Sequence, residues 1–241
     1  MANNTTVLVL QHIDCEPPAT YEDLVLDSGL AIHRVELDEG EPLPGHVDFA
    51  AMVVMGGPMG AMDDSRHRWL QEERSFINRA VMAGVPYWGV CLGAQLLAAS
   101  LGGTVYTGPT PEIGAFRISR TSESNDDPVF GRLPAEFDVF QWHSDTFTLP
   151  DGAVRLAGSA TYENQAFCLG SAYGVQFHVE VNATLAARWA GVEAYQQSLR
   201  QVHGEDGAER VMKELVNGER NNRAIATTIF GEWLGRFVLH G

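Results

Sequence analysis

Cys91 is the residue of this sequence best placed to act as a nucleophile. It lies in the segment Gly89-Val90-Cys91-Leu92-Gly93, between a short apolar run and an alanine- and leucine-rich one. Glycines two residues before and after a nucleophile are typical of a sharp strand-to-helix turn, where larger side chains would collide. Such a turn exposes the sulfur, and the positive end of the helix stabilises a thiolate. The pattern therefore predicts a nucleophilic cysteine.

A thiolate nucleophile needs an acid–base partner, and that partner needs a group that orients it. His178 and Glu180, separated by Val179, offer both. We expect them at the end of a strand over residues 174–178, where residues two apart project to the same side. The carboxylate would then fix the imidazole tautomer and leave the other ring nitrogen for Cys91.

A third segment could bind negative charge that develops on a substrate oxygen. An expected strand over residues 49–55 runs into Gly56-Gly57-Pro58. Backbone amides in a turn without Cβ atoms are accessible to a ligand, and here they could act beside the N–H of Leu92 as an oxyanion hole.

The other candidate groups are interpreted as structural. Cys15 and Cys168 have no glycine turn around them, and three cysteines are too few and too scattered for a disulfide framework or a zinc knuckle. A metal bound by His178 and Glu180 would need a third ligand, and the available histidines, such as His143, are distant in the sequence. We therefore expect no metal and no cofactor.

The elements that must position these residues alternate between short apolar runs and longer amphipathic ones. We expect strands over residues 5–10, 31–37, 49–55 and 85–90, and helices over residues 66–83 and 92–101. This order predicts an α/β fold with a doubly wound, mostly parallel sheet and helices on both faces.

The middle of the chain changes character, and the end is helical. Strands are expected over residues 116–120, 137–142, 154–159, 166–169 and 174–178, as an antiparallel extension packed onto the parallel sheet. From about residue 182 the pattern predicts C-terminal helices, with Ile225, Ile229 and Trp233 on one face. That face could close the core or form an interface. We expect one domain over residues 1–181 and a helical extension over residues 182–241 packed on it.

Composition excludes several classes of partner. The 241 residues include 16 Lys and Arg against 31 Asp and Glu, a net charge of −15, so no nucleic acid or anionic membrane is expected as a partner. No run approaches the roughly 20 apolar residues of a membrane span, and the N-terminus has no basic region. A cytoplasmic setting is expected. The sequence does not predict the oligomeric state.

Together these segments resemble the class I, triad-type glutamine amidotransferase family. The resemblance rests on Gly56-Gly57-Pro58, on residues 89–95, which end at Gln95, and on residues 176–180. Residues 112–114 and 141–147 are similar to its free-standing, GMP-synthase-like branch. The resemblance covers about residues 5–181 and implies a flavodoxin-like α/β fold.

The resemblance implies a role for each residue of the motifs. Cys91 would attack the side-chain amide carbon of glutamine. His178 would protonate the departing ammonia and then activate water against the γ-glutamyl thioester, while Glu180 orients it. The amides of Gly57 and Leu92 would form the oxyanion hole.

The glutamine head group would be held by Gln95 and by the backbone of His143, Ser144 and Asp145. Two positions depart from the family pattern. Val179 stands where proline is common, but its side chain should point away from the chemistry. Ser144 stands where the branch often has glycine, a residue that can adopt backbone conformations closed to serine.

Three functions remain open at this point. The first is a glutaminase or amidotransferase that releases ammonia, and the second is a hydrolase of other γ-glutamyl compounds through the same thioester. The third is a non-catalytic binding protein, which the presence of Cys91, His178 and Glu180 disfavours. No ATP-pyrophosphatase loop or Walker A motif occurs, and residues 182–241 are too few for a synthetase. An ammonia-accepting synthetase would therefore be a separate partner.

Overall fold

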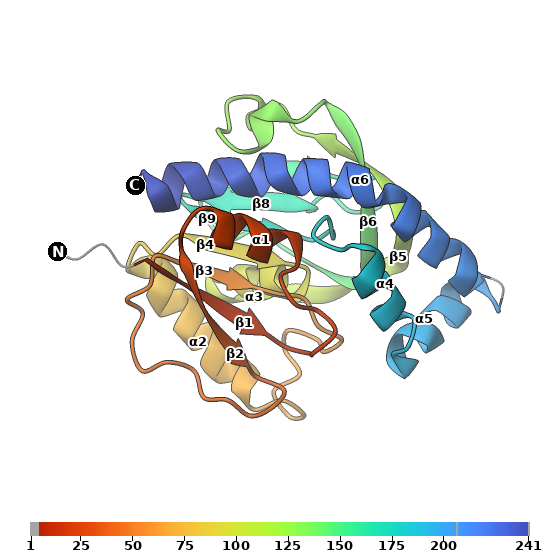
Figure 1. Cartoon of the computed structure of the whole chain (residues 1–241), viewed down its shortest axis with the longest axis horizontal. Helices are drawn as coiled ribbons and strands as arrows, with labels where there is room; N and C mark the ends of the chain where they lie inside the picture. The colour runs from red at the N-terminus through yellow and green to blue at the C-terminus, as the bar shows by residue number, and fades with distance from the viewer. Residues whose placement is uncertain (1–4, 206, 241) are drawn as a thin grey trace.

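The computed structural model describes residues 5–205 and 207–240, in which nine strands form one sheet (Figure 1). The strands are β1 (Thr6–Gln11), β2 (Ala31–Glu36), β3 (Ala51–Val54), β4 (Tyr87–Val90), β5 (Val105–Arg120), β6 (Glu136–Phe147), β7 (Val154–Gly158), β8 (Ala166–Leu169) and β9 (Ala172–Val175). The helices are α1 (Thr20–Asp27), α2 (Trp69–Met82), α3 (Leu92–Ser100), α4 (Ala183–Trp189), α5 (Glu193–His203) and α6 (Gly207–Leu234), with 3-10 turns at Glu123–Asn125 and Phe130–Arg132 and a π-helical turn at Gly235–Leu239.

The sheet has a parallel part and an antiparallel part. Its order is β2-β1-β3-β4-β9-β8-β7-β5-β6, and the strands from β2 to β9 in this order pair in parallel. The antiparallel strands do not pack onto the parallel sheet as the sequence suggested. They continue it edge to edge, because β8 pairs with β9 through a short turn.

Alternation along β1 explains why helices cover both faces of the sheet. Val7 and Val9 belong to one buried cluster, whereas Leu8 and Leu10 belong to another. Side chains two apart in a strand point to the same face, so a strand that is apolar throughout supplies two cores. Helices α1 and α6 cover the first core, and α2 and α3 cover the second. The predicted doubly wound α/β architecture is confirmed.

The C-terminal helices close the core and do not leave their apolar face free. Ile225, Ile229 and Trp233 of α6 are buried in the same cluster as Val7. Figure 1 shows α6, in blue, running beside α1 across the sheet, with α4 and α5 at one end of the molecule. The domain boundary at residue 181 stays a prediction, although one core includes residues from both sides of it.

Several local predictions were wrong or incomplete. The strands expected over residues 116–120 and 137–142 are only parts of the longer β5 and β6. The strand expected over residues 174–178 ends at Val175, and His178 forms only an isolated bridge with Phe140. Helix α1 was not predicted, because residues 20–27 form barely two turns and have a weak apolar pattern. None of the described helices is long and apolar enough to cross a membrane.

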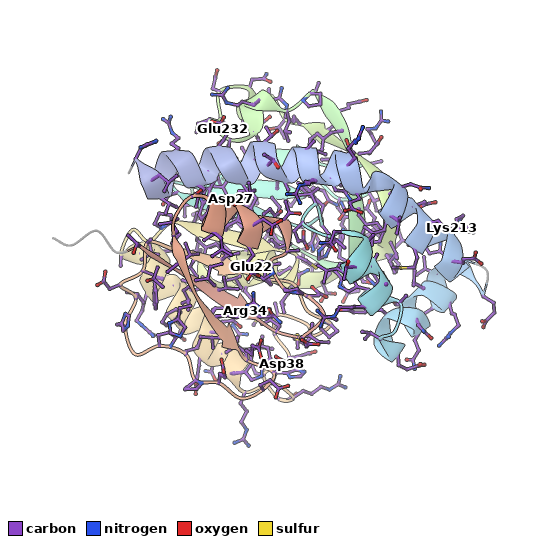
Figure 2. The ribbon with its side chains drawn as sticks, viewed as in Figure 1. Glu22, Asp27, Arg34, Asp38, Lys213 and Glu232 are labelled. Carbon is purple, nitrogen blue, oxygen red and sulfur yellow. The ribbon has the colours of Figure 1, made fainter. Side chains whose placement is uncertain are left out.

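Surface charge contributes little to holding these layers together. Asp27, Asp38 and Lys213 lie on the outside of the molecule, and Glu22 pairs with Arg34 between α1 and β2 (Figure 2). A partly exposed pair of this kind contributes at most about 1 kcal/mol. The two apolar cores therefore provide most of the stability that positions the site.

Candidate functional site

Cys91 lies on the strand-to-helix turn that the sequence predicted. It follows β4, and its φ of 51° and ψ of −105° are strained values for a residue with a side chain. Its amide donates a 2.8 Å hydrogen bond to the carbonyl of Val175, which fixes the turn to β9. A Cβ on Gly93 would lie 2.1 Å from the carbonyl oxygen of Val54, and one on Gly89 would lie 2.6 Å from Gly93. Both glycines are therefore sterically required.

His178 and Glu180 form a buried pair beside this turn. Nδ1 of His178 lies 2.8 Å from Oε1 of Glu180, and both side chains are almost fully buried. The pair does not depend on strand alternation. The amide of His178 donates to the carbonyl of Phe140, and the amide of Val179 donates to the other oxygen of Glu180. The chain after β9 is therefore held by β6 and by the carboxylate itself.

The surroundings of His178 favour its protonated form. Burial by itself lowers the pKa of the imidazole. The charge of Glu180 and the adjacent Cys91 side chain have the larger, opposite effect, so the pKa lies well above its ordinary value. Because Glu180 occupies Nδ1, the Nε2 edge is left for Cys91. The Cys91 thiol also lies 3.8 Å from the carbonyl oxygen of Trp142. A thiol beside a stabilised imidazolium is arranged for nucleophilic chemistry.

The two residues whose amides were expected to form the oxyanion hole line the same cavity as Cys91. Gly57 follows β3, and Leu92 is the first residue of α3, where helical N–H groups have no acceptor in a preceding turn. A side chain at Gly57 would clash, since its Cβ would lie 2.6 Å from Sδ of Met59 and 2.9 Å from Cβ of His12. This placement is compatible with the expected oxyanion hole.

The residues expected to bind the substrate, 143–145, lie within β6 and are held by backbone contacts. Gln95 donates to the carbonyl of Asp145 at 3.4 Å and to Oε1 of Gln176 at 3.1 Å. Nδ1 of His143 lies 2.9 Å from the same carbonyl. Ser144 is exposed in the extended backbone of β6 and is not among the non-glycine residues with positive φ. Serine therefore needs no strained conformation at this position.

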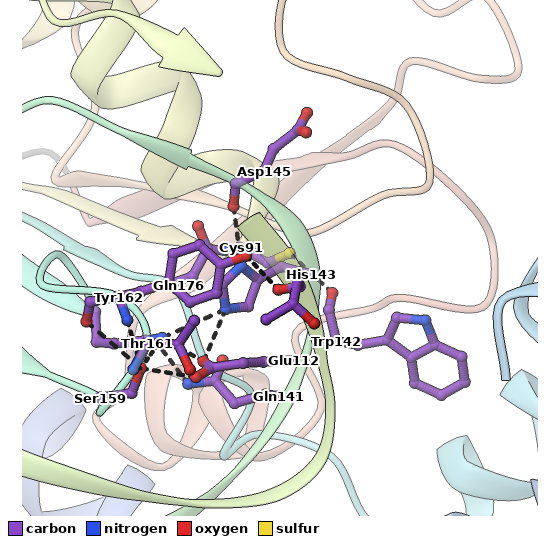
Figure 3. Close-up of polar contacts among 12 residues, drawn as sticks. Cys91, Glu112, Gln141, Trp142, His143, Asp145, Ser159, Thr161, Tyr162 and Gln176 are labelled. Carbon is purple, nitrogen blue, oxygen red and sulfur yellow. Dashed lines mark hydrogen bonds and ion pairs between the residues drawn. The ribbon is translucent and has the colours of Figure 1, made fainter. Parts of the chain in front are cut away.

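A buried polar network lies behind this segment of β6. Oε2 of Glu112 is 3.3 Å from Nε2 of His143 and accepts a 2.8 Å hydrogen bond from Gln165, while Ser159 donates to Oε1 of Glu112 (Figure 3). The ring of Tyr162 packs on His143 at 4.8 Å. The His143 side chain therefore contacts this network, and its backbone belongs to the segment of β6 over residues 143–145.

One cavity of about 310 Å³ brings these groups together. Of the residues predicted for the site, it is lined by Gly57, Cys91, Leu92, Gln95, His143, Ser144, Asp145 and His178. Glu180 lies behind His178, at its Nδ1. No group of three or more His, Cys, Asp or Glu side chains able to hold a metal occurs in the described part of the chain.

Sequence reasoning missed the side of the cavity that α4, α5 and the loop after β1 form. Trp189, Tyr195 and Ser198 line it, and so does the buried carboxyl of Glu16. The ring of Trp189 stands edge-on to His178 at 5.1 Å. Burial raises the pKa of Glu16, although His178 and the Tyr195 hydroxyl act against this. An isolated glutamate in a proline-containing loop carries no sequence signal of such a role.

Comparison with known proteins gives a consistent result. A family model described as "Glutamine amidotransferase class-I" matches residues 24–189, more than half of the chain. The glutamine amidotransferase-like protein YfeJ of Salmonella typhimurium is 31% identical over 232 residues, which cover 94% of this chain and 93% of that protein.

Two further relatives extend the comparison. The crystal structure of a glutamine amidotransferase from Thermotoga maritima is 32% identical, with a TM-score of 0.85 and 98% of both chains covered. The glutamine-hydrolysing GMP synthase of Thermomicrobium roseum is 29% identical over 201 residues, which cover 75% of this chain but 36% of that protein. The chain therefore matches only about a third of the length of this synthase.

Proposed function

The chain belongs to the class I glutamine amidotransferase family, and we propose that it hydrolyses the side-chain amide of glutamine through a Cys91-His178-Glu180 triad, releasing ammonia. One observation carries the proposal. His178 is held through Nδ1 by Glu180 at 2.8 Å, while its other edge faces a cysteine on a strained strand-to-helix turn.

In the first half of the reaction the thiolate of Cys91 attacks the amide carbon. The carbonyl π bond opens, and its electron pair becomes an oxyanion that the amides of Gly57 and Leu92 stabilise. As the oxyanion collapses, the C–N bond breaks and the imidazolium of His178 gives its proton to the departing nitrogen. The products are ammonia and a γ-glutamyl thioester on Cys91.

In the second half, neutral His178 takes a proton from water as that water attacks the thioester carbon. Collapse of the second oxyanion breaks the C–S bond, releases glutamate and returns the thiolate beside the imidazolium. Glu180 stabilises the imidazolium in both halves and keeps the ring oriented. The raised pKa of His178 supports a ring that is protonated before the C–N bond breaks.

Recognition of the head group is assigned to Gln95 and to the backbone of residues 143–145. The contacts of Gln95 and His143 with the carbonyl of Asp145, at 3.4 Å and 2.9 Å, hold this segment of β6 along the cavity that it lines. The cavity volume of about 310 Å³ is at the small end of the range for small-molecule sites, which favours free glutamine over larger γ-glutamyl compounds.

We also propose that residues 1–181 and 182–241 act as one catalytic unit, and that any ammonia-consuming synthetase is a separate chain. The first point is supported by α4 and α5, which supply Trp189 and Tyr195 to the cavity. The second is supported by the GMP synthase, whose match with this chain covers 36% of the synthase.

The test measures ammonia released from glutamine and amine released from γ-glutamyl dipeptides by the purified chain. Wild type is compared with Cys91→Ser, and Cys168→Ser serves as the matched control because Cys168 is also buried but is remote from the cavity lining. We expect glutamine turnover that Cys91→Ser abolishes and Cys168→Ser retains.

Each other outcome is informative. Turnover of dipeptides without turnover of glutamine would replace the proposed substrate with other γ-glutamyl compounds. Turnover of neither substrate would support a non-catalytic binding protein and overturn the proposal.

A further inference from the structure

A third histidine–glutamate pair lies beneath the cavity and has no part in the mechanism described above. His12 follows β1 and Glu73 belongs to α2, and both side chains are fully buried. Nε2 of His12 is 2.9 Å from Oε1 of Glu73, and Nδ1 is 3.0 Å from the carbonyl oxygen of Gly56. Trp69 stacks on the ring with the centroids 5.5 Å apart. Burying two ionisable groups is costly, so their contact with Gly56 calls for a physical reason.

The carbonyl of Gly56 and the N–H of Gly57 belong to one peptide unit. In a trans peptide these two groups point in opposite directions, and the described backbone contains no cis peptide bond. A hydrogen bond that holds the Gly56 oxygen toward His12 therefore turns the Gly57 N–H away from His12. Gly57 lines the cavity of Cys91, and this N–H is the one assigned to the oxyanion hole.

A peptide between two glycines needs such an anchor. Glycine adopts positive and negative φ almost equally readily, so this peptide unit could rotate and withdraw its N–H with little steric cost. No side chain of this segment can hold the peptide by packing, because both of its residues are glycine. Gly56 has no room for one, since a Cβ there would lie 2.1 Å from Oε2 of Glu16.

We propose that His12 and Glu73 are positioning residues that hold the Gly56–Gly57 peptide in the orientation in which the Gly57 N–H stabilises the oxyanion. The inference rests on the proposed function, because it assigns these residues to that reaction. His12 touches no reacting atom and acts through the peptide. The pair makes the oxyanion hole a fixed part of the free protein, formed before any substrate binds.

The proton count of the pair is consistent with this role. Both Gly56 oxygen and Glu73 carboxylate are acceptors, so His12 satisfies both only as an imidazolium, or as a neutral ring facing a protonated Glu73. Burial lowers the pKa of His12, but the charge and hydrogen bond of Glu73 and the Gly56 carbonyl raise it above its ordinary value. In either of the two states named above, Nδ1 carries a proton and donates it to the Gly56 carbonyl.

Two substitutions of His12 separate positioning from simple packing. The Nδ2 group of asparagine replaces Nδ1, so His12→Asn keeps the donor to Gly56 and loses the contact with Glu73. The side-chain end of glutamine replaces Nε2, so His12→Gln keeps the contact with Glu73 and loses the donor. Each variant loses one hydrogen bond, and His12→Asn is expected to be the less stable of the two because it leaves the buried carboxyl of Glu73 without a partner. A lower activity of His12→Gln would therefore not follow from lower stability.

The activities of the two variants are expected to differ. Loss of an oxyanion donor typically costs about 100- to 1,000-fold in kcat. We expect His12→Gln to lower kcat for glutamine by about 10- to 100-fold with little change in KM, and His12→Asn to stay within about threefold of wild type. Alkylation of Cys91 by iodoacetamide, which forms no oxyanion, should proceed at the wild-type rate in both.

Asn78→Ala is the control for stability, because it removes a 2.9 Å hydrogen bond from α2 to Ser100 away from the cavity. Its kcat should not change. If His12→Gln is folded and keeps the kcat of wild type, or if both His12 variants lose kcat equally, the positioning role is wrong while the triad stands. If wild type turns over neither glutamine nor γ-glutamyl compounds, the proposed function fails and this inference fails with it.

Discussion

Tyr195 donates a hydrogen bond to the buried carboxylate of Glu16, which lies 179 residues earlier in the sequence. Both residues line the cavity that contains Cys91, and the bond ties α5 to the loop after β1. The C-terminal helices therefore do more than close the core. They supply one wall of the site and the partner of a charge that burial would otherwise destabilise.

Removing this hydroxyl should destabilise the protein in a pH-dependent manner. Tyr195→Phe leaves a buried carboxyl oxygen without its donor, at a cost of about 1–3 kcal/mol. The folded-state pKa of Glu16 is already raised, and losing the donor raises it further. Stability linked to a raised carboxyl pKa is present at low pH and is lost as the pH rises through that pKa. Urea unfolding should therefore show a larger loss at pH 8 than at pH 5.

The control for this measurement is Tyr106→Phe, since the Tyr106 side chain is half exposed. We expect no measurable change in its free energy of unfolding. An equal loss for Tyr195→Phe at both pH values would mean that Glu16 does not change its ionisation in this range.

Cys91 should be the first thiol to react with iodoacetamide. Burial raises the pKa of Cys15 to about 11 and that of Cys168 to about 12, so at pH 7.5 roughly one molecule in a thousand or fewer has either thiolate. Mass spectrometry after brief alkylation should find one modified peptide, the one with Cys91. Modification of Cys15 or Cys168 first would contradict the assignment of the nucleophile.

Glu180→Gln should lower the activity and should remove the pH-dependent stability that His178 contributes. By analogy with the aspartate of serine proteases, kcat should fall by up to about 10⁴-fold. Burial lowers the folded-state pKa of His178, but the charge of Glu180 outweighs this effect and raises the pKa above its ordinary value. The stability that the protonated His178 contributes is therefore present below the ordinary histidine pKa and is lost as the pH rises through the raised value.

The variant loses that contribution, so its melting temperature should lie furthest below that of wild type at about pH 6, below the ordinary histidine pKa, and approach it at higher pH. Glu136→Gln is the control, because Glu136 pairs with Arg117 at the surface. A constant difference from pH 6 to pH 9 would argue against the coupling of Glu180 to His178.

Two glycine substitutions should change stability in opposite directions. Gly93→Ala places a Cβ 2.1 Å from a backbone oxygen of β3, so α3 must shift, at a cost of about 1–3 kcal/mol or more and with loss of turnover. Gly231→Ala, in α6, meets no atom within 4 Å and should stabilise by about 0.5–1 kcal/mol. Thermal unfolding measures both, and a neutral Gly93→Ala would contradict the steric argument for the turn.

Much of the fold was predictable because its signals are local. The apolar strand over residues 5–10, the helix that starts at Leu92 and the turn at Cys91 depend on residues adjacent in the sequence. Gly89 is the clearest case, since a Cβ there would lie 2.6 Å from the backbone of Gly93 in the same turn, whereas the clash at Gly93 is with Val54 of the neighbouring strand. The short strand at β9 was overestimated, because a short apolar run does not show where hydrogen bonding to a neighbour stops.

The sequence by itself determined which residues are candidates for the chemistry, namely a cysteine with glycines two residues to each side and a histidine two residues from a glutamate. Its alternation of strands and helices determined the α/β architecture. Only the tertiary structure decided which other groups face that chemistry. The contacts of Glu16 with Tyr195 and of His12 with Glu73 join distant segments, and neither member of either pair has a local pattern. Sheet order and helix packing bring them together, and those depend on the burial of many interchangeable apolar residues.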